Sequence, residues 1–146
     1  SLIQNRNCKC VNKAVFSKSD LEVDFCIHKY GEYREDGISG ITDYLDKHRE
    51  KVLKNETRIK VKTQTLNDIL EENKSPYIID YLSLDTEGTE LEILKSVNLN
   101  KYKFKIISIE HNHILKRRNE IFKLLTSYNY KLYKSIKADD FFIYQL

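Results

Sequence analysis

The fold is decided by the stretch Ile79-Asp80-Tyr81-Leu82-Ser83-Leu84-Asp85-Thr86-Glu87-Gly88-Thr89-Glu90-Leu91-Glu92-Ile93-Leu94. In it, an apolar run ends in an acidic turn that contains one glycine, and leucines at helical spacing follow. This order is typical of a strand, a turn and a helix. In an open α/β sheet, ligands bind outside the carboxyl ends of the strands. Asp85 and Glu87 are therefore expected to lie where a ligand is held.

Segments typical of strands and helices alternate on both sides of this stretch. Further strands are predicted over residues 8–16, 21–27, 58–63 and 105–110. A helix is predicted to begin at Thr65, because Asp68 follows it at the spacing of a capping box, and another covers residues 115–128. Polar residues and glycines predict a loop over 31–40, then a short helix over 42–53; residues 131–134 and 140–144 predict a closing hairpin. Together these elements predict βαβ units in a mostly parallel α/β sheet that ends in an antiparallel pair.

Length and composition predict one domain with a single core, since the chain has 146 residues of which 40% are apolar. No uncharged apolar run reaches the roughly 20 residues that a membrane span needs, so no membrane span is expected. Cys8, Cys10 and Cys26 form no CxxC pair, which favours a reducing, cytoplasmic location. Buried thiols explain these cysteines better than a zinc site completed by His28. No pattern predicts an oligomeric state.

Two basic stretches, residues 101–105 and 116–118, raise the question of nucleic-acid binding. The first is interleaved with aromatic residues, as in proteins that bind single strands. The net charge is only +3, so opposite charges leave no broad basic field. We therefore interpret both stretches as solvated faces and do not expect a nucleic-acid partner.

Thr65-Leu66-Asn67-Asp68-Ile69-Leu70, followed by residues 79–90, resembles the signature of the FkbM-type methyltransferases. These are S-adenosylmethionine-dependent enzymes that mostly methylate oxygen. The strand at 107–110 and the hairpin segments 128–132 and 139–142 resemble later parts of that family, and residues 12–15 are similar to its third strand. The resemblance implies a Rossmann-like class I fold over residues 1–146, with 31–54 as a variable insertion. It also implies a small-molecule or glycan hydroxyl as the methyl acceptor.

One part of the family pattern is missing from this sequence. Members of the fold bind the cofactor on a glycine-rich turn after the first strand, but Gly31, Gly37, Gly40 and Gly88 form no G-x-G, and no strand is predicted before Cys8. The resemblance therefore implies that the chain corresponds to the latter two-thirds of such a domain. We expect weak cofactor binding by the chain alone. The alternative is a non-catalytic, methyltransferase-like interaction domain that does not bind the cofactor.

The acidic turn supplies the first candidate site residues. A carboxylate at Asp85 can orient an acceptor hydroxyl or the amine of the methyl donor, so Asp85 is predicted to be both catalytic and cofactor-binding. Glu87 is a candidate for substrate binding, whereas Glu90 is explained by the first turn of a helix, where the macrodipole favours acidic residues. Gly88 is expected to shape the turn.

Glu110, His111 and Asn112 follow the next predicted strand and can face Asp85 across the same crevice. His111 or Glu110 is a candidate general base, and Asn112 a candidate substrate contact. A different use is Mg²⁺ binding through oxygens of Asp85, Glu110 and Asn112, as in some O-methyltransferases. A polar loop with a solvated histidine is the third reading.

Ala14 and Val15 lie where the resemblance places the lining of the adenine pocket. Both also fit as ordinary core residues of a strand. They are retained as candidate cofactor contacts on the resemblance alone.

Overall fold

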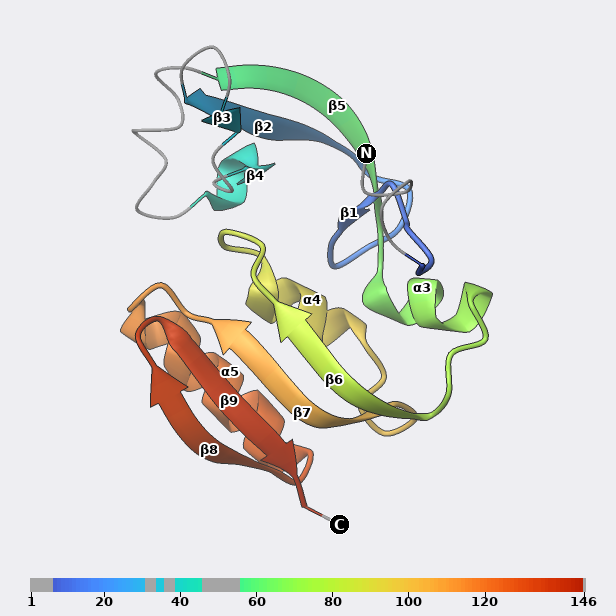
Figure 1. Cartoon of the computed structure of the whole chain (residues 1–146), viewed down its shortest axis with the longest axis vertical. Coiled ribbons are helices and arrows are strands. Elements are labelled where there is room, and N and C mark those ends of the chain that lie inside the picture. The colour runs from blue at the N-terminus through green and yellow to red at the C-terminus, as the bar shows by residue number, and fades with distance from the viewer. Residues whose placement is uncertain (1–6, 31–33, 36–38, 46–55, 146) are drawn as a thin grey trace.

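The computed structural model describes residues 7–30, 34–35, 39–45 and 56–145, in which the chain forms two β-sheets and three α-helices (Figure 1). The first sheet has the order β1-β5-β2-β3, and β4 pairs with β2. Its strands are β1 (Ala14–Val15), β2 (Glu22–Tyr30), β3 (Arg34–Glu35), β4 (Gly40–Ile41) and β5 (Glu56–Gln64). A 3₁₀ turn, η1 (Thr42–Tyr44), follows β4, and α3 (Leu66–Glu72) follows β5.

The second sheet has the order β6-β7-β9-β8, and two α-helices pack on it. Its elements are β6 (Ile78–Leu84), α4 (Glu90–Ser96), β7 (Lys103–Glu110), α5 (Leu115–Ser127), β8 (Tyr130–Ile136) and β9 (Asp139–Tyr144). Because α4 provides a crossover, β6 and β7 run parallel, whereas β8 and β9 form the antiparallel hairpin predicted from the sequence. The carboxyl ends of β6 and β7 therefore lie side by side.

One face of the second sheet and the helices packed on it form the main hydrophobic core. The register places Leu82, Ile107 and Phe142 in one row across β6, β7 and β9. Ile107 and Phe142 are fully buried, together with Ile93 of α4 and Leu125 of α5. Burying a side chain of this size stabilises the fold by about 1.5–3 kcal/mol. This packing gives the β6 and β7 ends a rigid support.

The first sheet meets the second at the turn after β6, which extends toward β4 in Figure 1. Gly40 lies so close to this turn that an added Cβ would be 3.3 Å from the Thr86 carbonyl oxygen and 3.4 Å from the Glu87 Cβ. A side chain at position 40 would press on Leu45 Cδ2, at 3.1 Å, and on the backbone of the acidic turn. The β4 strand therefore forms part of the surroundings of Asp85.

Most predicted elements are observed, with corrections in strand direction and extent. The prediction of a mostly parallel sheet is wrong. Among the described strands, β1–β5 and β6–β7 are parallel and the other pairings are antiparallel. Alternation identifies a strand but not its direction. Of the strand predicted over 8–16, only Ala14–Val15 pairs, beside the end of β5. Of the helix predicted over 42–53, Thr42–Tyr44 is a 3₁₀ turn, and residues 46–55 lie outside the described part.

Smaller predictions are also tested. The α3 cap is confirmed, because the Thr65 hydroxyl accepts a hydrogen bond from the Asp68 N–H at 3.0 Å. Thiol burial is confirmed for Cys26 and wrong for Cys8 and Cys10, which are exposed because they precede β1 outside any strand. The predicted loop over 31–40 contains β3 and the first residue of β4. Residues 31–33 and 36–38 lie outside the described part, and so does the side chain of His28. No helix in the described ranges combines the length and apolarity that crossing a bilayer requires.

Candidate functional site

The site is built on the turn that joins β6 to α4. Asp85 is the first residue after β6, and Glu87 and Gly88 both have a positive φ, of 58° and 133°. Glycine adopts such angles without steric cost, whereas a residue with a Cβ needs support from its surroundings. Gly88 therefore adopts its backbone conformation readily, whereas Glu87 needs contacts that hold its conformation in place.

The side chain of Glu90 fixes the conformation of this turn. Its fully buried carboxylate accepts hydrogen bonds through Oε1 from the Thr86 N–H (2.8 Å), the Thr86 hydroxyl (3.0 Å) and the Gly88 N–H (3.1 Å). Its Oε2 accepts a hydrogen bond from Arg117 Nη1 at 2.9 Å. Glu90 does lie at the start of α4, as the sequence predicted, but its carboxylate also fixes the backbone on both sides of Glu87.

Three carboxylates meet at the ends of β6 and β7. The ligand oxygens of Asp85, Glu87 and Glu110 all lie within 4.8 Å of one another. The Asn112 side-chain amide donates a hydrogen bond to Glu110 Oε2 at 2.7 Å. The structure thus brings together four of the predicted site residues from two loops that are more than twenty residues apart in sequence.

Crowding of these carboxylates changes their acidity. Burial, followed by the negative charges of Asp85 and Glu87, raises the pKa of Glu110 to about 7. Partial burial also raises the pKa of Asp85, while a hydrogen bond from Glu110 acts in the opposite direction and favours the ionised form of Asp85. Glu110 therefore exchanges its proton near neutral pH, and while it keeps that proton its hydrogen bond favours the ionised form of Asp85.

The Glu110 carboxyl is expected to titrate with a midpoint near 7 in a ¹³C NMR pH titration. Asp85→Asn should lower that midpoint because it removes a neighbouring negative charge, whereas Asp80→Asn should leave it unchanged. Because the native Glu110 keeps a proton that the unfolded chain loses above about pH 4.5, the free energy of unfolding should fall as the pH rises from 4.5 to 7. A Glu110 midpoint near 4.5 would contradict the crowded arrangement.

His111 lies at the other side of the β7 end and is buried. Its Nδ1 accepts a hydrogen bond from the His113 N–H at 3.0 Å, and its Nε2 lies 3.7 Å from Asp140 Oδ1. Burial lowers the pKa of His111, so the imidazole is neutral and carries its proton on Nε2. The Nδ1 atom is thus committed, whereas the buried Nε2 has no hydrogen-bond partner among the described residues. The general-base role of His111 stays a prediction, and it would require the Nδ1 bond to open.

A cavity of about 260 Å³ adjoins the acidic turn. Its walls come from the first sheet with its adjoining loops and from the turn after β6: Lys13, Ala14, Val15, Phe25, Ser39, Ile41, Asp85, Thr86 and Thr89. The three residues predicted to contact the cofactor, Asp85, Ala14 and Val15, therefore line one cavity. Sequence reasoning did not single out Phe25 and Ile41, because their place here depends on the pairing of β2 with β4 and β5.

The two basic stretches are largely engaged in the fold. Tyr102 and Phe104, the aromatic residues of the first stretch, are buried in the core and are not available for stacking on bases. In the second stretch, Arg117 pairs with Glu90 and Arg118 with Asp140. The ion-pair partners of both arginines are distant in sequence, which is why the sequence pattern did not reveal these pairs.

The fold and the site define a mixed α/β protein with an acidic site at the carboxyl ends of two parallel strands, beside a cavity. A family model described as the methyltransferase FkbM domain matches residues 4–132. This chain belongs to the FkbM methyltransferase family. No curated protein and no solved structure matches it.

Proposed function

We propose that this protein is an S-adenosylmethionine-dependent O-methyltransferase of Rossmann-like type that acts on a hydroxyl of a small molecule or glycan. The observation that carries the proposal is the cavity in which Ala14 and Val15 face the same space as Asp85. Family membership supports methyl transfer. The cofactor and the oxygen acceptor are the further steps that we propose here.

The charge and the apolar character of the residues around the cavity suit this cofactor. The Asp85 carboxylate offers a partner for an ammonium group, and the apolar side chains of Ala14, Val15 and Ile41 offer a surface for a ring. The bound cofactor would supply an activated methyl group on a positively charged sulfur. The protein's task is then to align the acceptor oxygen and to remove its proton.

Asp85 is the residue proposed to remove that proton. It is ionised when Glu110 keeps the proton of the pair, so its oxygen can accept the hydrogen of an acceptor hydroxyl. When an acceptor oxygen takes up a methyl group, Asp85 would receive the proton that this oxygen loses. Glu87 and Asn112 would contact the acceptor, because both lie beside Glu110.

The same carboxylates are a candidate site for Mg²⁺. Asp85, Glu87 and Glu110 offer three oxygens within reach of one ion, with the Asn112 amide beside Glu110, and oxygen ligands are those that Mg²⁺ prefers. A cation there would relieve the repulsion that raises the pKa of Glu110. Stronger binding of S-adenosylhomocysteine with Mg²⁺ than with a chelator would support this role, and equal binding would count against it.

Calorimetric titration of S-adenosylmethionine and S-adenosylhomocysteine tests the proposed function. We expect weak but saturable binding, reduced at least about tenfold in Asp85→Asn, the loss expected for one hydrogen bond to a charged group. Asp80→Asn is the matched control, since Asp80 lies on the same strand with a side chain that is 88% exposed. Absence of saturable binding by folded wild-type chain would overturn the proposal and favour the non-catalytic interaction domain.

A further inference from the structure

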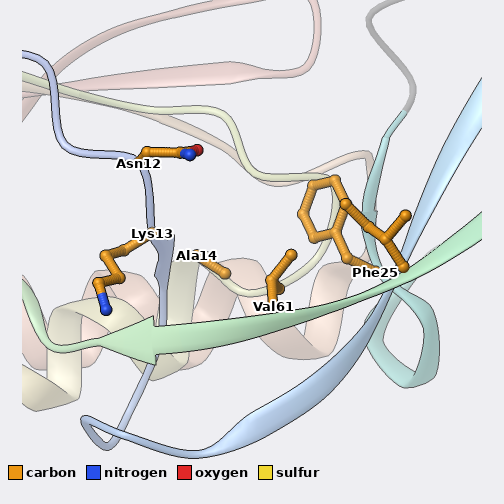
Figure 2. Close-up of a pocket in the computed structure, with 6 residues that line it drawn as sticks. Asn12, Lys13, Ala14, Phe25 and Val61 are labelled. Carbon is orange, nitrogen blue, oxygen red and sulfur yellow. The ribbon is translucent and has the colours of Figure 1, made fainter.

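A second hollow, of about 170 Å³, lies on the first sheet next to β1. Its lining consists of Asn12, Lys13, Ala14, Phe25, Ile59 and Val61. In Figure 2 the side chains of Ala14, Val61 and Phe25 surround one space and the Asn12 amide reaches over it, while Lys13 extends to the other side of β1. The hollow is thus apolar at its base and has one neutral polar group at its rim.

The register of the first sheet creates this hollow. Phe25 pairs with Ile59 across β2 and β5, and Val61, two residues further along β5, points to the same face as Ile59. β1 runs beside the end of β5, where the small side chain of Ala14 leaves space open. Ile59 remains 41% exposed, and it is not part of the main core cluster. An apolar concave surface with few polar groups is the usual form of a small-molecule site.

The hollow adjoins the cavity at Asp85. Lys13, Ala14 and Phe25 line both spaces, so the two share a wall formed by β1 and β2. A molecule bound in the hollow with its apolar part against Ile59 can therefore direct a polar group toward Asp85. The change from carboxylates at one end to apolar side chains at the other indicates which kind of molecule fits.

We propose that the hollow binds an aromatic ring of the methyl acceptor, whose hydroxyl then lies toward Asp85. This inference rests on the proposed function. An aromatic ring fits because Phe25 offers an aromatic wall for stacked or edge-to-face contact, Asn12 offers one hydrogen-bonding group, and the volume suits a single ring. Acceptors without an apolar ring, such as simple sugars, would leave this surface unused.

Binding of p-cresol, an aromatic ring that carries a hydroxyl, tests the inference in the full chain. We expect NMR shifts at the methyl groups of Ala14, Ile59 and Val61, and binding at least about fourfold weaker in Ile59→Ser, the factor for losing one buried methylene. Ile106→Ser is the matched control, because Ile106 on β7 is equally exposed at 41%. Unchanged p-cresol affinity in Ile59→Ser would overturn the inference.

A parallel titration with S-adenosylhomocysteine separates this inference from the proposed function. Ile59→Ser should bind S-adenosylhomocysteine as the wild type does, because Ile59 lines the hollow and is not among the residues of the Asp85 cavity. Weakened S-adenosylhomocysteine binding in Ile59→Ser would place the cofactor in the hollow and overturn the inference while leaving the function standing. Loss of wild-type S-adenosylhomocysteine binding with p-cresol binding intact would instead sink the function.

Discussion

Replacing Glu90 with alanine is expected to lower the free energy of unfolding by about 3–5 kcal/mol, the usual cost of removing one partner of a buried ion pair. The side chain is fully buried and accepts four hydrogen bonds. Its loss leaves Arg117, which is itself mostly buried, without this carboxylate, and it leaves the N–H groups of Thr86 and Gly88 without their acceptor. Both effects destabilise the folded state.

Urea unfolding of Glu90→Ala beside Glu92→Ala measures this effect. Glu92 is two residues away on the same helix and pairs with Lys95 at 3.1 Å, but both side chains are solvent-accessible. Its removal should change the free energy of unfolding by no more than about 1 kcal/mol. Equal losses in the two variants would show that helix-end electrostatics, which both residues share, explain Glu90 and that the buried contacts do not.

Glu90→Gln separates the charge of Glu90 from its shape. An amide can still accept hydrogen bonds from the turn through its oxygen, but it cannot neutralise Arg117. This variant should therefore retain the positive φ of Glu87 better than Glu90→Ala does, at a similar cost in stability. Since Asp85 directly precedes the held segment and Glu87 lies within it, cofactor affinity should fall more in Glu90→Ala than in Glu90→Gln.

The elements that the sequence predicted well are those defined by local chemistry. The strand, acidic turn and helix of residues 78–96 follow from an apolar run, a glycine and leucines at helical spacing, and the cap at Thr65 follows from a spacing of three residues. The meeting of Asp85 with Glu110 was also predictable, because the ends of parallel strands lie at one edge of a sheet.

The features that sequence reasoning missed depend on contacts between distant segments. Glu90 fits a helix start equally well with or without Arg117, which is 27 residues away, so its role in holding the turn has no local signature. The same is true of Phe25, which reaches the site only through the antiparallel register of β2 and β5. Strand direction and long-range ion pairs are set by packing, and periodicity does not encode either of them.

Asp140→Ala is expected to cost about 3–5 kcal/mol of unfolding free energy for the same reason as Glu90→Ala. Asp140 is almost fully buried and receives two hydrogen bonds from Arg118, at 2.7 and 2.8 Å, and one from the Ser135 hydroxyl at 2.6 Å. These bonds outweigh the effect of burial and hold the pKa of Asp140 below its ordinary value. The variant removes a hydrogen-bond acceptor of Arg118 and Ser135, and it removes the carboxylate that lies 3.7 Å from His111 Nε2.

The decisive comparison is with Asp80→Ala, because pair distance and pair burial lead to different expected losses of unfolding free energy for this variant. The Asp80–Lys105 pair is as short as any Asp140 contact, at 2.6 Å, but both of its side chains are well exposed. If distance set the contribution, the two variants would be equally destabilised; because water screens the exposed pair, Asp80→Ala should cost no more than about 1 kcal/mol. The depressed pKa of Asp140 adds a pH signature, since its contribution is present above about pH 3.8 and is lost as the pH falls further. Urea unfolding at pH 7 and pH 3 should therefore show a large gap between wild type and Asp140→Ala that narrows in acid, and a constant gap would mean that Asp140 stabilises the hairpin by packing and not by its charge.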